Sequence, residues 1–194
     1  MKLKIFENNI IIEKYPYPPS KIFPSAIIHP SNIDCIVKGL NFPTIRTKDG
    51  EFIIFYESRP DINILKDYAN LNKIRKTNYI NIWSLILDVF LDKKHTKEDN
   101  ERNLEILEKA GLERNKVIEI RKEINYMMLS YNFGSGLWEF AYLDMIDLLD
   151  ACIGKLNAGT ELSNEKFSKF YWEIMKIQDI GKIEKYPNHS NLNH

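Results

Sequence analysis

Residues 113–156 carry the pattern that decides the fold, and they read ERNKVIEIRKEINYMMLSYNFGSGLWEFAYLDMIDLLDACIGKL. An α-helix turns by about 100° per residue, so side chains three and four positions apart share a face. This spacing predicts two long helices that are joined at residues 131–136, YNFGSG. One side of the second helix is apolar, and we expect it to pack on a hydrophobic core. Its residues are Leu137, Trp138, Ala141, Met145, Leu148, Leu149, Cys152, Ile153 and Leu156.

The opposite side of this predicted second helix is acidic. It carries Glu139, Asp144, Asp147 and Asp150. Asp144 and Asp147 are three residues apart and offer the oxygen ligands that a hard cation prefers. Metal sites on helices, however, pair such carboxylates with histidine or with carboxylates that a second helix turns inward. Because these aspartates point away from the apolar side, we expect a solvated helix face without a metal ion.

The first third of the chain has the pattern of β-strands. Short β-prone runs occupy residues 2–6, 9–13, 25–29 and 33–38. The Asp49-Gly50 pair favours a hairpin turn, with residues 44–47 and 51–57 as the paired strands. Residues 15–20, YPYPPS, contain three prolines, which exclude a helix. We expect this segment to be a rigid connector packed on the fold rather than an arm that binds a partner.

From residue 61 onward the pattern is helical. Asp61 can cap a helix, residues 78–91 show helical spacing, and Thr96 with Asp99 forms a capping-box sequence before a helix that ends at Gly111. A last helix begins near Ser163. The sequence therefore predicts an α+β fold in a single domain at 1–185. It combines an antiparallel β-rich lobe (1–58, with strands to about residue 57) and a lobe of five to six helices (61–180), followed by a frayed tail at 186–194.

The overall charge and the cysteines exclude several functional classes. The chain has 27 basic and 27 acidic residues, so it lacks the basic excess of a typical nucleic-acid-binding or polybasic membrane-binding protein. Cys35 and Cys152 fit no metal or redox spacing, and we expect buried free thiols. The N-terminus lacks the pattern of a signal peptide and no apolar run is long enough to span a membrane. We expect a cytoplasmic protein.

Motifs for common catalytic sites are absent from the sequence. No glycine-rich phosphate loop, nucleophile elbow or pair of histidines at a ligand spacing occurs, so we expect no cofactor and assign no catalytic or metal-binding residue. Pro60-Asp61, taken with Asp92-Lys93-Lys94, superficially resembles the metal-dependent nuclease pattern of Pro-Asp followed by an acid, any residue and a lysine. The resemblance implies carboxylates on a metal with a lysine nearby, on adjacent strands. Here Asp92 ends a predicted helix, which departs from that pattern.

Aromatic residues gather around the predicted turn at residues 131–136. Aromatic side chains with a polar tip are frequent anchors at protein interfaces, although they are also ordinary core residues. We predict a binding surface at Tyr131, Phe133, Trp138 and Tyr142. The leading hypothesis is a small cytoplasmic protein of bacterial type that binds another protein, with an immunity or antitoxin-like inhibitor as one instance. The alternative is a metal-dependent hydrolase or nuclease that uses carboxylates near Asp61. Homo-oligomerisation stays open.

Overall fold

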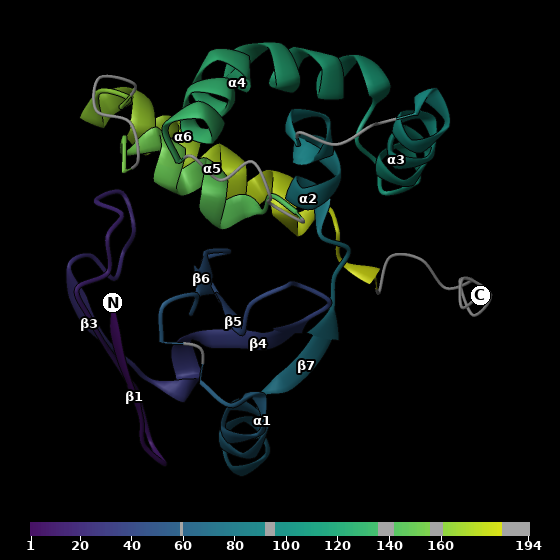
Figure 1. The fold of residues 1–194 in the computed structure, drawn as a ribbon. Coiled ribbons are helices and arrows are strands. Elements are labelled where there is room, and N and C mark those ends of the chain that lie inside the picture. Colours follow the sequence, from purple (N-terminus) through teal and green to yellow (C-terminus); the bar gives the residue numbers. More distant parts are fainter. Residues whose placement is uncertain (59, 92–95, 136–141, 156–160, 184–194) are drawn as a thin grey trace. The chain divides into compact units, whose positions relative to one another are not determined.

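The structure is a computed structural model that describes residues 1–58, 60–91, 96–135, 142–155 and 161–183, with only the backbone at 133–135. The α+β class predicted from the sequence is confirmed (Figure 1). The chain forms two compact units. The sheet unit comprises Met1–Pro16, Pro24–Ile80 and Gly181–His194, and the helical unit comprises Tyr17–Phe23 and Asn81–Ile180. Each unit therefore combines segments that are distant in sequence.

The first sheet of the sheet unit has three antiparallel strands in the order β1-β2-β3. Their bounds are Lys2–Ile5 for β1, Ile10–Glu13 for β2 and Ser25–Ile28 for β3. A tight turn joins β1 to β2, in which the Phe6 amide donates to the carbonyl of Asn9 at 2.9 Å. Ile10 and Ile12 are buried while Ile11 is half-buried, so β2 alternates as a strand with one covered face does.

The second sheet contains the hairpin that the Asp-Gly pair predicts. Its strands are β4 (Ile33–Lys38), β5 (Thr44–Thr47), β6 (Phe52–Ile54) and β7 (Arg75–Asn78), in the order β6-β5-β4-β7. Gly50 lies at φ +88° in the β5–β6 turn, a conformation that glycine adopts without strain. A 3₁₀ turn, η1 (Pro30–Asn32), precedes β4.

The strand β7 lies in a region where the sequence indicates only helix. It pairs with β4 in parallel, and such a pairing needs a crossover connection. The helix α1 (Ile62–Leu71) lies in this crossover and contacts β4 and β1 (Figure 1). The helix predicted over residues 78–91 begins later, because Asn78 ends β7, Tyr79 forms a β-bridge with Lys182 and Asn81 is the N-cap of the helix at Ile82–Leu87.

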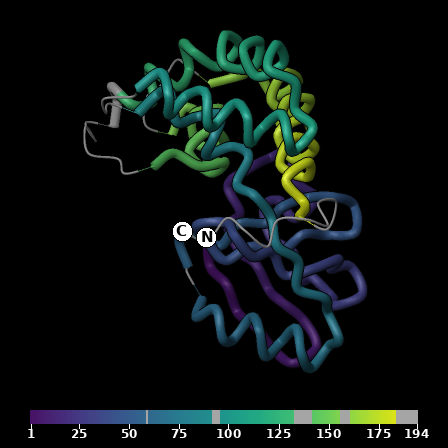
Figure 2. Tube along the Cα trace, turned by 90° about the vertical axis from the view of Figure 1, so that its right-hand side faces the viewer, coloured from purple at the N-terminus to yellow at the C-terminus, as the bar shows by residue number. Residues whose placement is uncertain are grey.

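The helical unit contains the remaining helices. They are α2 (Ile82–Leu87), the 3₁₀ turn η2 (Asp88–Phe90), α3 (Lys97–Lys109), α4 (Arg114–Ser135), α5 (Met145–Cys152) and α6 (Asn164–Asp179). The longest, α4, contacts α2, α3 and α5 (Figure 2). Thr96 and Asp99 form the predicted capping box of α3, and Gly111 follows α3 with φ +97°. The buried Trp83 indole N–H donates to the carbonyl of Ile174 at 3.0 Å and ties α2 to α6.

The proline-rich segment is a packed connector, as predicted. Residues 17–23, which begin inside this segment and continue past it, belong to the helical unit, where Tyr17 is fully buried. The Tyr17 ring lies 6.4 Å from that of Tyr171 on α6, and the Lys21 ammonium lies 5.9 Å from the Trp172 ring. A short segment from the N-terminal third of the chain thus completes the core of the helical unit.

Two predicted features of residues 113–156 are wrong. The first helix continues to Ser135, so residues 131–135 are helical and form no turn. The second helix begins at Met145 with Asp144 as its N-cap, so Tyr142 and Leu143 precede it. The predicted helical residues Leu137, Trp138, Glu139 and Ala141 lie outside the described residues. Among the described residues, no helix has both the length and the apolar composition needed to span a membrane.

Candidate functional site

The acidic side of α5 is covered, which corrects the expectation of a solvated face. Asp144 is 3% exposed and Asp150 is 6% exposed, whereas Asp147 is half-buried. The sequence pattern misleads here because other segments of the helical unit supply hydrogen-bond donors to these carboxylates. A buried carboxylate is tolerated when such partners are present.

Each end of α5 uses one buried aspartate. At the N-terminus, Asp144 accepts from the Met145 amide at 2.6 Å and from the Asn81 side chain at 3.0 Å. At the C-terminus, Asp150 accepts from the Tyr17 hydroxyl at 2.7 Å and from the Lys155 ammonium at 2.9 Å. The two aspartates therefore fix α5 to the start of α2 and to the proline-rich connector.

Asp147 is the carboxyl group whose acidity the structure changes most clearly. Its side chain accepts from the Asp144 amide at 2.7 Å and from the Tyr131 hydroxyl at 3.1 Å. Burial is the main cause that raises the pKa of Asp147 to about 6; the nearby charges of Asp144 and Asp150 add to the increase and the two hydrogen bonds oppose it. A carboxyl with this pKa exchanges its proton near neutral pH, a property that general acids and bases share.

The structure brings no metal centre together at these aspartates. Among the described residues, no group of three or more histidine, cysteine or acidic side chains is placed to hold a metal ion. The oxygens of the capping box of Asp144 and Asp147 are directed to backbone amides and side-chain donors, which explains their burial without a cation.

The predicted aromatic binding residues are placed differently from one another. Tyr131 is buried and bonded to Asp147, and Tyr142 is exposed ahead of α5. The side chain of Phe133 and all of Trp138 lie outside the described residues, so the aromatic binding surface stays a prediction. Cys35 and Cys152 are buried free thiols, as expected.

The residues of the nuclease-like pattern show no shared site. Asp61 is exposed and caps α1, where its carboxylate accepts from the Asn63 amide at 2.8 Å. Asp92, Lys93 and Lys94 lie outside the described residues. The N-cap geometry accounts for an aspartate at position 61 in structural terms.

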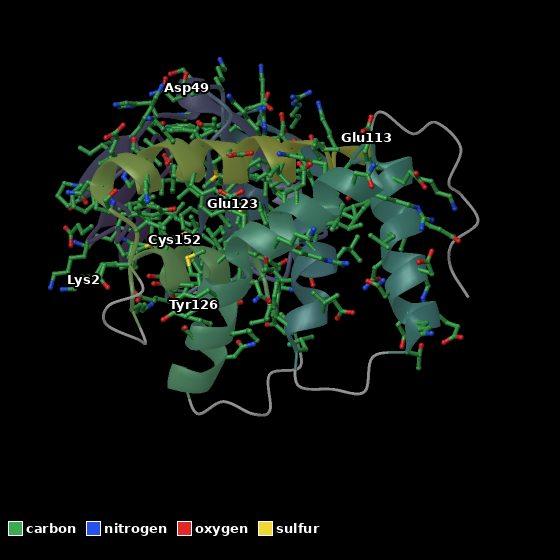
Figure 3. The ribbon with its side chains drawn as sticks, turned by 90° about the horizontal axis from the view of Figure 1, so that it is seen from above. Lys2, Asp49, Glu113, Glu123, Tyr126 and Cys152 are labelled. Atoms are coloured by element: carbon green, nitrogen blue, oxygen red, sulfur yellow. The ribbon has the colours of Figure 1, made fainter. Side chains whose placement is uncertain are left out.

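A groove lies between η2 and α4 in the helical unit, with a volume of about 410 Å³. Three apolar side chains on its walls are exposed, namely Val89, Ile118 (44%) and Leu129 (41%). Tyr126, on the same helix, is 74% exposed (Figure 3). The residues that line the groove are Val89, Phe90, Ile118, Arg121, Lys122, Asn125 and Leu129.

These side chains are exposed because α4 carries apolar residues on two faces. Val117, Ile120 and Ile124 are buried against the rest of the unit. Ile118 and Leu129 are eleven positions apart, close to three full turns, and therefore share a different face. The sequence places Ile118 and Leu129 on one face of the helix. Val117, Ile120 and Ile124 form a more obvious apolar face, so the sequence pattern singles out only that one.

Arg121 is a fixed cation in the wall of the groove. Its guanidinium donates to the carbonyls of Leu85 and Ile86 at 3.2 and 3.0 Å, at the end of α2, and to the side chain of Asn100 at 2.9 Å. Burial lowers the pKa of Arg121, but a guanidinium titrates so far above neutral pH that it stays charged. The groove therefore combines apolar walls with a positive charge.

The comparisons with known proteins identify no relative. No family model matches the chain, and neither a curated protein nor a solved structure matches it. Any functional conclusion consequently depends on the chemistry of the described residues.

Proposed function

We propose that this protein is a protein-binding module and that the groove between η2 and α4 receives its partner. The observation that carries the proposal is the exposure of Ile118 and Leu129 on the rim of a groove of about 410 Å³. Exposed apolar side chains beside a concave surface are characteristic of interaction sites, because water around them is released on binding. Arg121 and Tyr126 add the residue types that interfaces use most.

A protein fits this surface better than a small molecule does. Small-molecule sites bring several polar groups together on one ligand, whereas the polar residues of this groove are Arg121, Lys122 and Asn125, all from α4. The Arg121 donors are already directed to the end of α2 and to Asn100. The exposed Tyr126 extends the amphipathic surface along α4.

A nucleic acid fits less well. The chain has no net charge, and Glu119 and Glu123 are exposed on α4 close to the groove. These carboxylates repel phosphates, and nucleic-acid affinity depends on the neutralisation of several phosphates.

An immunity or antitoxin-like inhibitor is one instance of such a module. The proposal includes a cytoplasmic location, which the two free cysteines support because thiols stay reduced in that compartment. The alternative, a metal-dependent hydrolase or nuclease at Asp61, gains no support from the described residues.

Site-specific photo-crosslinking in the source cells tests the proposal. A benzophenone amino acid replaces Ile118, Leu129 or, as a control on α3, the exposed Glu105. We expect one protein to be captured from positions 118 and 129 and not from position 105, because only the first two lie on the groove. The same captured proteins at all three positions, or none at 118 and 129, would contradict the proposal.

A further inference from the structure

The second wall of the groove is the short 3₁₀ turn η2, from which Val89 and Phe90 line the groove. A turn of three residues forms few hydrogen bonds of its own. Within η2 the Leu91 amide donates to the Asp88 carbonyl at 3.2 Å. The other carbonyls at the end of a helical turn need donors from elsewhere. The position of this wall therefore depends on side chains of other elements.

Two side chains of α4 donate to the backbone on either side of Val89. Before η2, the Arg121 guanidinium donates to two carbonyls in the last turn of α2. At the end of η2, the Asn132 side-chain amide donates to the carbonyl of Phe90 at 2.6 Å. Arg121 and Asn132 are eleven positions apart, close to three full turns, so both project from one face of α4. One helix thus forms one wall of the groove and also holds the other wall.

A third contact comes from α3. The Asn103 side-chain amide donates to the Asp88 carboxylate, at the start of η2, at 2.9 Å. The charge of Asp88 also acts on Arg121, whose pKa burial lowers and Asp88 raises. Among the residues that the structure describes, neither Asn103 nor Asn132 lines the groove. A substitution at either asparagine therefore leaves the lining side chains unchanged.

We infer that Asn103, Arg121 and Asn132 are positioning residues of the groove, which fix η2 so that Val89 and Phe90 form its second wall. Their role in binding rests on the proposed function, whereas the position of η2 does not. A wall that is fixed in advance lowers the entropic cost of association, because η2 is already ordered when a partner docks.

A distance measurement across the groove tests the position of η2 without a partner. Spin labels are attached to the full chain at Val89→Cys on η2 and Glu119→Cys on α4, two exposed positions, while the native cysteines are buried and stay unlabelled. Double electron–electron resonance then gives the distribution of distances between the labels. We expect one narrow distribution, which becomes broader or shifts in Asn132→Leu and in Asn103→Leu because η2 loses a donor at one end.

Asn115→Leu is the matched control, since Asn115 is exposed on α4 and does not line the groove. It is expected to keep the narrow distribution. Asn132→Asp is a second variant at the same position, because it retains the shape of the side chain and replaces the donating amide with an acceptor. Circular dichroism and urea midpoints establish that each variant is folded.

Photo-crosslinking from position 118 tests the role of the asparagines in binding. Capture of the partner is expected to fall about fivefold in Asn132→Leu and Asn103→Leu, the factor that one hydrogen bond typically carries, and to stay unchanged in Asn115→Leu.

Three results would overturn the inference. One is a distance distribution that stays narrow and unshifted in both variants. Another is a lower urea midpoint with an unchanged distribution, which would show that the asparagines only stabilise the unit. The third is undiminished capture from a chain whose distribution has broadened. Absence of capture in the wild-type chain would contradict the proposed function alone, because the distance measurement decides the position of η2 separately.

Discussion

Helices α4 and α5 belong to the same unit and differ in which residues they bury. On α5 the acidic side is covered, with Asp150 bonded to Tyr17 and Lys155. On α4 the apolar Ile118 and Leu129 are exposed to solvent. Burial of a carboxylate costs free energy unless donors are present, and exposure of an apolar side chain forgoes the gain of burial. The comparison teaches that polar contacts hold the acidic side of α5 against the unit, while α4 leaves apolar side chains exposed on one face.

The largest expected effect concerns two neighbouring isoleucines on α4. Ile120→Ala is expected to lower the free energy of unfolding by about 4 kcal/mol, because Ile120 is buried and its loss leaves a cavity. Ile118→Ala is expected to cost far less, about 1 kcal/mol or below, because Ile118 is 44% exposed and its loss leaves no enclosed cavity. Urea unfolding followed by tryptophan fluorescence measures both, since Trp83 and Trp172 belong to the helical unit. Equal losses of unfolding free energy for the two variants would contradict the assignment of Ile120 to a buried face and Ile118 to an exposed face of α4.

The next effect tests the covered side of α5. Asp150→Ala removes the acceptor of the hydrogen bonds from Tyr17 and Lys155, and we expect a loss of about 3 kcal/mol in the free energy of unfolding. The same urea experiment with Glu123→Ala, an exposed carboxylate on α4, serves as the control. If the two substitutions cost the same, Asp150 is no more important to folding than a solvated acid.

Asp147 on α5 is expected to make the free energy of unfolding depend on pH. Its pKa rises from an ordinary value of 3.8 to about 6 in the folded state. Below about pH 4 the carboxyl is protonated in both states, whereas above about pH 6 it is ionised in both and its burial opposes folding. The wild type is therefore expected to lose about 2 kcal/mol relative to Asp147→Asn as the pH rises from 4 to 7.

Subtraction of the Asp147→Asn curve removes the contribution of the other carboxyl groups to this pH dependence. Urea midpoints of the two proteins at several pH values provide the measurement. A difference that stays constant across this range would show that Asp147 titrates as an ordinary solvated carboxyl group.

The smallest effect separates the two partners of Asp150. Tyr17→Phe removes the hydroxyl donor and leaves the Lys155 contact in place, so we expect a loss of about 1 kcal/mol. A double-mutant cycle of Tyr17→Phe with Asp150→Ala isolates the coupling between them. A coupling energy near zero would mean that the connector is held by its aromatic packing and not by this hydrogen bond.

Much of the fold was predictable where local chemistry decides it. The Asp49-Gly50 turn, the Thr96 capping box and the cap at Ser163 depend on residues within a few positions of one another, and the structure contains all three features. The strand β7 was missed because Arg75–Asn78 becomes a strand only through its pairing with β4, which lies about forty residues earlier.

The candidate site was less predictable than the fold. The aromatic cluster drew attention to Tyr131, which the structure buries, and away from Ile118 and Leu129. A helical wheel of residues 114–135 shows that these two share a face, but it cannot show that η2 forms the other wall of a groove. The carboxylates of α5 were misjudged for the same reason, since Tyr17 and Asn81 come from distant parts of the chain.

The sequence by itself determined the α+β class, most helix and strand positions and the burial of both cysteines, because periodicity, caps and turn residues act over short distances. Tertiary structure alone decided which face of each helix is covered. That choice depends on the donors and apolar surfaces that distant segments bring to it. For this reason the aspartates of α5 are buried beside Tyr17 and Asn81, and the apolar stripe of α4 is left exposed.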